Sequence, residues 1–377
     1  MHLAVGAGAM LKRIYIHNYK TFVNFEWRPP QVCALVGENG AGKTAFIEIL
    51  SVVRQLVVDG KRIDETALPS SRTAWLTEVE QIVELEIDHD GHRFLYRLEC
   101  LQGKRDPELR ERLSVGNVDL YRSSDGKVDL FWDDPNLAAR VTIPFERRRS
   151  FIAALESTST DRRIVSFRAA IEAFWRIKPD PARMGSAASG ESDWLAPDLS
   201  NFADWYRAKV QEDPEASTAL QVDLRNVVAG FAQLRLETLT QRAREIRVRF
   251  DFGKSTHELP WSELSEGQRL LIALYGVLRF AVKHTTLLAL DEIDNYVALP
   301  EIQPWLRSVV DAMSSKDGQL IVVSHHPESI DYLAADAVWV MSRDRLAGHT
   351  RIARLEPDLD AGETASAALM SGATGHA

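Results

Sequence analysis

The chain has 377 residues, with 45% hydrophobic and 26% charged side chains and a net charge of −9 at pH 7. This composition is ordinary for a globular protein with a buried core, and the length allows one large α/β domain with an insertion, or two domains. No apolar run is long enough to cross a membrane, and the N-terminal apolar stretch lacks the basic region of a signal peptide. The negative charge argues against a protein that coats nucleic acid with its whole surface.

The cysteine content points to a reducing compartment. Cys33 and Cys100 are each flanked by apolar residues of strand character. Two isolated cysteines make neither a disulfide framework nor a metal site. We therefore expect two buried thiols and a cytoplasmic protein.

Residues 10–145 are predicted to form an N-terminal lobe with a phosphate-binding loop and an antiparallel sheet. Residues 1–9 are expected to be an unstructured extension, because an alternating strand begins at Leu11. The segment Val79–Leu101 also alternates and has turn residues at its centre, Asp88–His92. This pattern predicts a β-hairpin.

One segment of this lobe fits the phosphate-binding pattern G-x-x-x-x-G-K-[ST]. An apolar strand, Val32–Val36, precedes it, and a helical run, Ala45–Val53, follows it, as this motif requires. Glycines let backbone N–H groups point at phosphate oxygens, and the helix N-terminus adds positive charge. Lys43 is expected to reach the β- and γ-phosphates of ATP, and the Thr44 hydroxyl to hold Mg²⁺. The predicted ATP-binding residues are Gly37, Glu38, Asn39, Gly40, Ala41, Gly42, Lys43 and Thr44.

Residues 146–244 are predicted to be a helical insertion. Apolar spacing predicts a helix within Phe167–Ile177, and further helices are expected at 201–211 and 215–240. Residues near 184–200 are rich in Gly and Ser, which is typical of a loop or a weakly ordered linker.

The stretch Arg140–Arg183 holds ten basic residues and five acidic ones. A charge run of this kind is usually a solvated face. The alternative is a site for DNA or for an acidic partner, and Arg147, Arg148 and Arg149 are the best candidates because they are consecutive.

Residues 245–357 are predicted to form a C-terminal ATPase lobe, and the Ala- and Gly-rich tail at 358–377 is expected to be disordered. Helices and buried strands alternate in this lobe, which is typical of a parallel sheet. The expected strands are Leu287–Leu290, Leu320–Val323 and Ala337–Met341, and the expected helices are 266–282, 300–314 and 327–334.

Two carboxylates follow the first of these strands directly. Ligands of α/β proteins bind at the carboxyl ends of parallel strands, so Asp291 and Glu292 are expected at the nucleotide. Asp291 would hold Mg²⁺ through water, and Glu292 would polarise the water that attacks the γ-phosphate. An acidic pair alone is a weak signal, but after a phosphate-binding loop it is a strong one.

Two further motifs complete the set. Ser265-Glu266-Gly267-Gln268 combines a hydroxyl and a glycine at a helix N-terminus, which makes an anion site, although Ser-x-x-Gln is also an ordinary capping box. Ile321-Val322-Val323-Ser324-His325 is a strand that ends in a histidine, and a lone histidine there is usually structural.

The order of these four motifs resembles that of ATP-binding cassette (ABC) type ATPases. Asn18–Phe22, ahead of the phosphate-binding loop, is similar to the corresponding strand of RecF and SMC (structural maintenance of chromosomes) proteins. Asp291–Asn295 and Ser324–Pro327 resemble RecF-like and OLD-like (overcoming lysogenisation defect) ATPases. The resemblance implies an ABC-ATPase head with a RecA-like parallel core, an N-terminal antiparallel β lobe and a helical lobe that carries the signature motif.

The resemblance also implies an ATP site shared by two chains. The loop of one chain would hold ATP, and Ser265, Gly267 and Gln268 of the other would close over the γ-phosphate. Asp294 and Asn295 would lie along the dimer seam, and His325 would contact the γ-phosphate as the switch histidine. The chain departs from the pattern where a glutamine is expected at the lobe junction, since Phe167-Arg168 stands near that place. It also lacks the heptads of SMC arms and the acids of a Toprim nuclease.

These features predict an ATPase that dimerises on ATP and acts on DNA or on a separate effector, such as a nuclease or a toxin, in antiphage defence or in DNA repair. The chain has no second catalytic constellation of its own, which is why a partner is expected. One alternative is the nucleotide-binding subunit of an ABC transporter, and another is a scaffold without activity.

Overall fold

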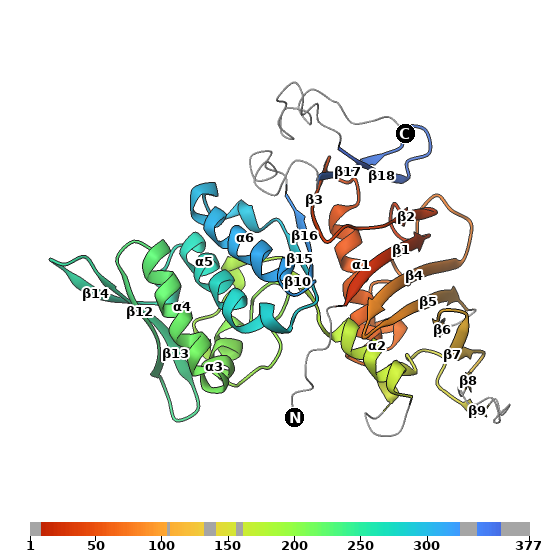
Figure 1. Cartoon of the computed structure of the whole chain (residues 1–377), viewed down its shortest axis with the longest axis horizontal. Helices are drawn as coiled ribbons and strands as arrows, with labels where there is room; N and C mark the ends of the chain where they lie inside the picture. The colour runs from red at the N-terminus through yellow and green to blue at the C-terminus, as the bar shows by residue number, and fades with distance from the viewer. Residues whose placement is uncertain (1–8, 104–105, 132–140, 156–160, 325–337, 356–377) are drawn as a thin grey trace.

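The computed structural model describes residues 9–103, 106–131, 141–155, 161–324 and 338–355. Within these residues the strands form three sheets, of eight, six and four strands. Figure 1 shows the eight-stranded sheet at one end of the molecule, the six-stranded sheet in the middle and the four-stranded sheet with its helices at the other end. This architecture agrees with the predicted α/β class.

The eight-stranded sheet is antiparallel and has the order β2-β1-β4-β5-β6-β7-β8-β9. Buried and partly buried residues alternate along β4, because one face of the sheet packs on the core. The predicted hairpin is confirmed as β4 and β5, which pair from His89 and His92 onward. The strands are β1 (Met10–His17), β2 (Phe25–Trp27), β4 (Glu80–His89), β5 (His92–Gln102), β6 (Pro107–Val115), β7 (Val118–Ser124), β8 (Lys127–Leu130) and β9 (Val141–Pro144).

The six-stranded sheet has the order β10-β15-β16-β3-β17-β18. Neighbouring strands are parallel except for β18, which runs antiparallel to β17. Helices cover both faces, which explains why the strands read as continuous apolar runs. The strands are β10 (Phe174–Ile177), β15 (Leu287–Asp291), β16 (Gln319–Val323), β3 (Val32–Gly37), β17 (Val338–Arg343) and β18 (Thr350–Arg354).

The two faces of this sheet belong to two hydrophobic cores. Cys33 and Leu35 of β3 pack with helices α1 (Lys43–Val57) and α2 (Arg162–Glu172) and with the antiparallel sheet. Ala34 and Val36 face the opposite core, which is built by α3 (Phe202–Glu212), α5 (Glu266–Gly276) and α6 (Leu299–Ser314). Cys33 and Cys100 are free and buried, as predicted.

The four-stranded sheet lies beyond these helices. Its strands are β11 (Ala187–Ala188), β13 (Arg244–Asp251), β12 (Phe231–Thr238) and β14 (Thr256–Pro260), with β13 paired to the other three. Helix α4 (Pro214–Val227) packs on β12, and the Gln221 amide exchanges two hydrogen bonds with the backbone of Leu234 (2.7 and 2.9 Å).

Two predicted helices are wrong in their second halves. Helix α2 ends at Glu172, and Phe174–Ile177 forms strand β10 because it pairs with β15 and buries two aromatic rings. The helix predicted at 215–240 ends at Val227, and Gly230, with a left-handed φ of 72°, leads into β12. The insertion is therefore a mixed α/β unit rather than a helical one.

The segment predicted as a weakly ordered linker packs on the core. Met184, Ala188, Leu195 and Leu199 are all buried, and the backbone N–H of Lys178 donates to the carbonyl of Pro197 (2.8 Å). Enough apolar side chains lie among the Gly and Ser residues to fix the segment in place.

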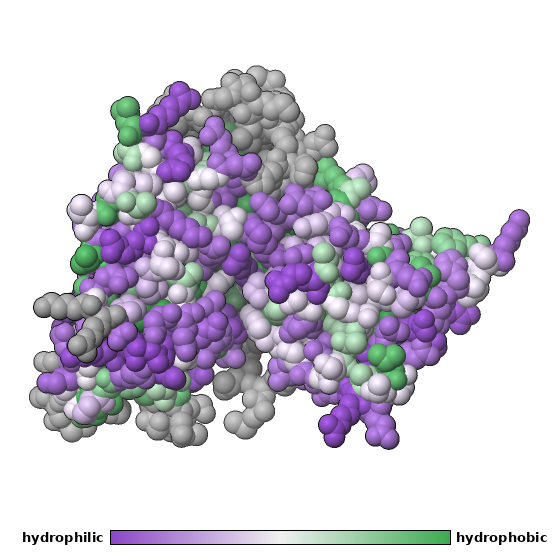
Figure 2. All heavy atoms as spheres, turned by 180° about the vertical axis from the view of Figure 1, so that it is seen from behind, coloured by the Kyte–Doolittle hydropathy of each residue, from purple (hydrophilic) through white to green (hydrophobic). Residues whose placement is uncertain are grey.

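Residues 1–8, the predicted helix 327–334 and the tail 358–377 lie outside the described residues. In the part of the chain that is described, no helix has the length and apolar character needed to span a membrane. Figure 2 shows a face on which hydrophobic side chains occur in small groups among hydrophilic ones.

Candidate functional site

The phosphate-binding loop joins β3 to α1, as the sequence predicts. Gly42, immediately before the helix, has a φ of 111°, which a side chain disfavours. The Lys43 ammonium donates to the carbonyl oxygens of Gly37 (2.6 Å) and Glu38 (2.9 Å). Burial lowers the pKa of Lys43, whereas the charges of Glu292, Asp291 and Glu38 act in the opposite direction. The loop thus holds a cation at the N-terminus of a helix, the position that binds phosphate in many proteins.

Asp291 and Glu292 lie at the same edge of the core sheet as the loop. Strand β15 ends at Asp291, and β16 lies between it and β3. Glu292 faces a cavity of about 300 Å³ together with residues of the loop. The lining residues are Lys20, Thr21, Asn39, Gly40, Gly42, Lys43, Thr44, Ala45 and Glu292.

The Asp291 carboxylate is completely buried and faces cations. The ammonium of Lys178 lies 3.2 Å from its Oδ2 atom, and the guanidinium of Arg176 lies 3.7 Å from the same atom. Burial raises the pKa of Asp291, although Lys178 and Arg176 act in the opposite direction. Neither carboxylate oxygen accepts a well-directed hydrogen bond from the described residues.

These donors suit a magnesium ion bound with a nucleotide. Mg²⁺ usually keeps one or two protein ligands and takes the rest from phosphates and water. The Thr44 hydroxyl and the Asp291 carboxylate are oxygen ligands of this kind. Among the described residues, no group of three or more His, Cys, Asp or Glu side chains is placed to hold a metal ion.

The signature residues lie outside this cavity in the same chain. Ser265 is the N-cap of α5 and forms a capping box with Gln268, at 3.1 Å in each direction. Gly267 has no room for a side chain, because a Cβ atom there would lie 2.8 Å from the Tyr296 carbonyl oxygen. The ordinary capping role predicted as an alternative is therefore present, and contact with ATP stays a prediction.

The segment after Glu292 connects the carboxylates to the neighbouring strand. Glu292 itself has a left-handed φ of 57°, which is unusual for this residue type. Asn295 is exposed, and its amide lies 3.5 Å from a Glu292 carboxylate oxygen, while Ser324 donates to Asp294. Their position along a dimer seam stays a prediction, and His325 lies outside the described residues.

The three candidate arginines all have acidic partners. Arg147 pairs with Glu108 (3.5 Å), Arg148 with Asp64 (3.4 Å) and Arg149 with Glu146 (3.1 Å). These pairs reduce the positive charge that the segment can offer to DNA.

Sequence reasoning missed four polar residues at the site. Lys20 and Thr21 line the cavity, and Arg176 and Lys178 face Asp291. The first two belong to the segment that carries the family resemblance, which was a usable signal. The other two follow from β10, which the sequence did not predict.

Comparison with known families agrees with this geometry. A family model described as "AAA domain, putative AbiEii toxin, Type IV TA system" matches residues 32–331. The chain belongs to this AAA family. The match includes the phosphate-binding loop, the signature residues and the carboxylate pair, so the prediction of an AAA-family P-loop ATPase is confirmed.

Two solved structures cover most of the chain. The SMC head bound to the C-winged helix domain of ScpA is 14% identical, with 93% of this chain and 99% of that chain covered and a TM-score of 0.57. The SMC head domain from Thermotoga maritima is 14% identical, with 92% and 99% covered and a TM-score of 0.48. The first of these likenesses supports the predicted ABC-ATPase head fold.

A curated relative matches over a short stretch. The ribose import ATP-binding protein RbsA of Corynebacterium glutamicum is 46% identical over 57 residues, which are 14% of this chain and 10% of that protein. The chain thus covers only a small part of this relative's length.

Proposed function

We propose that the chain is a Mg²⁺-dependent ATPase that dimerises on ATP and passes its nucleotide state to a separate effector protein. One observation carries the proposal: the loop residue Lys43 and the carboxylate Glu292 face the same 300 Å³ cavity at one edge of a parallel sheet. A cation for phosphate and a carboxylate for water are the two groups that ATP hydrolysis needs there.

Each group has a separate role in the proposed hydrolysis of ATP. Backbone N–H groups of the loop and the Lys43 ammonium bind the β- and γ-phosphates, and Glu292 accepts a proton from the attacking water. Thr44 and Asp291 would hold Mg²⁺, which neutralises charge that develops on the phosphates. Asp294, Asn295 and His325 are proposed to act at the dimer seam and at the γ-phosphate.

We infer dimerisation from the position of the signature residues. Ser265, Gly267 and Gln268 do not line the cavity of their own chain, and Ser265 is exposed. A second chain is therefore the source that would bring such residues to the γ-phosphate. Loss of the γ-phosphate would then remove contacts between the chains and let them part.

The proposed effector is a protein, such as a nuclease or a toxin, in antiphage defence or in DNA repair. The family description includes a putative toxin of a toxin–antitoxin system, which is a two-component arrangement. The SMC head of similar fold is bound to a domain of ScpA. Contact with DNA through Arg147, Arg148 and Arg149 stays a prediction, and their ion pairs weaken it.

The short match to a ribose import protein favours a second candidate, the nucleotide-binding subunit of a transporter. The two candidate functions differ in the protein to which the chain binds. A polytopic membrane protein that co-purifies with the chain would support the transporter, and a soluble effector would exclude it.

Replacement of Lys43 by Ala tests the catalytic part of the proposal. We expect phosphate release from Mg²⁺-ATP to fall at least about a hundredfold, because no other lysine follows a phosphate-binding loop. Lys283→Met is a matched control, since this lysine pairs with Asp213 away from the cavity. Wild-type turnover in Lys43→Ala would overturn the proposal.

A further inference from the structure

Lys178 holds a position beside the carboxylate pair that follows from the sheet register. Strand β10 is an edge strand and pairs in parallel with β15, so that Ile177 lies opposite Leu290. The next residues along the two strands are Lys178 and Asp291. Phe174 of β10 and Ala289 of β15 face the α1 side of the sheet, and alternation along the strands places Arg176 and Lys178 on that side as well.

The ammonium of Lys178 reaches both carboxylates. It lies 3.2 Å from Asp291 Oδ2 and 3.6 Å from Glu292 Oε2, and 38% of the side chain is exposed. Arg176 adds a second cation, 3.7 Å from Asp291. Lys178 therefore pairs with Asp291, the carboxylate that is proposed to bind Mg²⁺. A positive charge this close to Asp291 disfavours the approach of a second cation.

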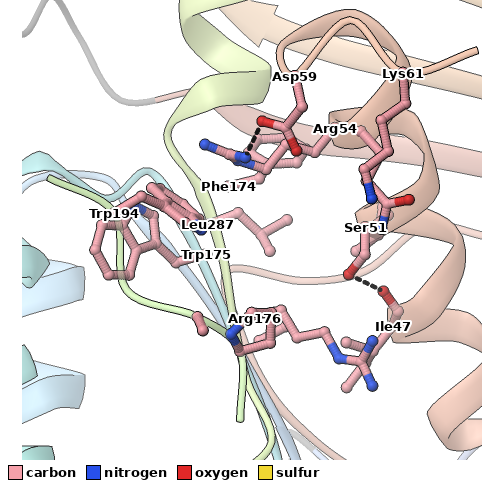
Figure 3. Close-up of a pocket in the computed structure, with 15 residues that line it drawn as sticks. Ile47, Ser51, Arg54, Asp59, Lys61, Phe174, Trp175, Arg176, Trp194 and Leu287 are labelled. Carbon is pink, nitrogen blue, oxygen red and sulfur yellow. Dashed lines mark hydrogen bonds and ion pairs between the residues drawn. The ribbon is translucent and has the colours of Figure 1, made fainter. Parts of the chain in front are cut away.

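The backbone around Lys178 is tied to the helix that follows the phosphate-binding loop. Its N–H donates to Pro197, and Asp180 N–H donates to Asp198 (3.0 Å). Trp194, in the same segment, packs between Trp175 (4.2 Å between rings) and the Arg54 guanidinium of α1 (3.5 Å from the ring centre). Figure 3 shows Trp194, Trp175 and Arg54, with Arg176 extended from β10 toward Ile47 of α1. These contacts hold in place the backbone from which the Lys178 side chain extends.

We propose that Lys178 is a positioning residue that competes with Mg²⁺ for Asp291 and orients Glu292. The inference rests on the proposed function, because it assigns a role at the same ATP site. With Mg²⁺ and ATP bound, the ammonium would give up Asp291 and keep Glu292. The lysine would then set the Mg²⁺ concentration that the site needs and hold the carboxylate proposed to accept the proton.

The test is a Mg²⁺ titration with a fluorescent, non-hydrolysable ATP analogue at fixed concentration. In Lys178→Met we expect the half-saturating Mg²⁺ concentration to fall about tenfold, since a competing charge is removed. Phosphate release from ATP should fall as well, because Glu292 loses the ammonium that is proposed to orient it. Lys178→Arg keeps the charge and should retain the wild-type Mg²⁺ dependence.

Lys283→Met serves as the control, because it removes a lysine–aspartate pair elsewhere, and its half-saturating Mg²⁺ concentration should equal that of the wild type. Lys178→Gln repeats the measurement with a shorter neutral side chain. If both neutral variants keep the wild-type Mg²⁺ dependence, Lys178 does not compete with Mg²⁺ and the inference is wrong. If the wild type itself binds no nucleotide, the proposed function fails and this inference fails with it.

Discussion

Two carboxylates with almost no exposure, Asp291 and Glu111, show how surroundings decide what a buried acid does. Asp291 faces two cations at the edge of a sheet. Glu111 lies inside the antiparallel lobe and accepts hydrogen bonds from the Tyr96 hydroxyl (2.6 Å) and the Phe151 backbone N–H (2.9 Å). A buried carboxyl group that accepts hydrogen bonds from neutral donors, such as Glu111, stabilises the fold. A buried carboxylate beside cations, such as Asp291, can exchange one cation for another.

Glu111 makes the stability of the protein depend on pH. Burial raises its pKa in the folded state above the ordinary value of 4.5, although Tyr96, Ser150 and Phe151 act in the opposite direction. Between about pH 4.5 and the folded-state pKa, Glu111 therefore keeps a proton in the folded state that it has released in the unfolded state. The stability that this group contributes is present at lower pH and is lost as pH rises through the folded-state pKa.

Melting temperatures measured from about pH 4.5 to pH 7.5 test this effect against Glu111→Gln, which does not titrate. As pH rises, the melting temperature of the wild type should fall relative to that of the variant. A difference that does not change with pH would show that Glu111 ionises in the folded state as readily as in the unfolded one.

At the scale of elements, the N-terminus of α5 combines a capping role with a proposed contact to ATP. Ser265 and Gln268 cap the helix, and Gly267 lets the helix lie against the Tyr296 carbonyl. The cap stabilises this helix end. The backbone N–H groups there can still face an anion that is bound by a second chain.

Ser265→Arg separates these roles. The variant should bind ATP within about twofold of the wild type, because the loop is untouched, but it should lose dimers and at least about tenfold in turnover. Ser265→Ala removes the cap without adding bulk, at a cost of about 1 kcal/mol. Ser308→Arg adds the same bulk on an exposed face of α6. Full turnover in Ser265→Arg would exclude the shared site.

Local patterns predicted the elements around the proposed nucleotide site. The elements that were missed depend on pairing between distant parts of the sequence. The strand Val32–Gly37, the loop and α1 are contiguous, so their signal lies in one short segment. Strand β10 becomes a strand only because β15, far along the chain, offers it a partner, and helical spacing at Phe174 and Trp175 gave the wrong answer. Lys178 was missed for the same reason.

At the scale of the whole molecule, the loop and the signature helix lie on different sides of the six-stranded sheet. Helix α1 packs on one face with the antiparallel lobe, and α5 packs on the other with α3 and α6. In the proposed dimer, two chains related by a twofold axis would each bring their signature residues to the phosphate-binding loop of the other. ATP-dependent pairing of two chains is therefore central to the proposed function.

Light scattering after size exclusion of Glu292→Gln tests that claim most directly. The variant keeps its phosphate and Mg²⁺ ligands but loses the group that accepts the proton, so the ATP-bound state should accumulate. With Mg²⁺-ATP we expect a mass twice that of the 42.3 kDa chain, and the mass of one chain without nucleotide. The double variant Lys43→Ala/Glu292→Gln should stay at one chain under both conditions. A single-chain mass for Glu292→Gln at saturating Mg²⁺-ATP and high protein concentration would contradict the account.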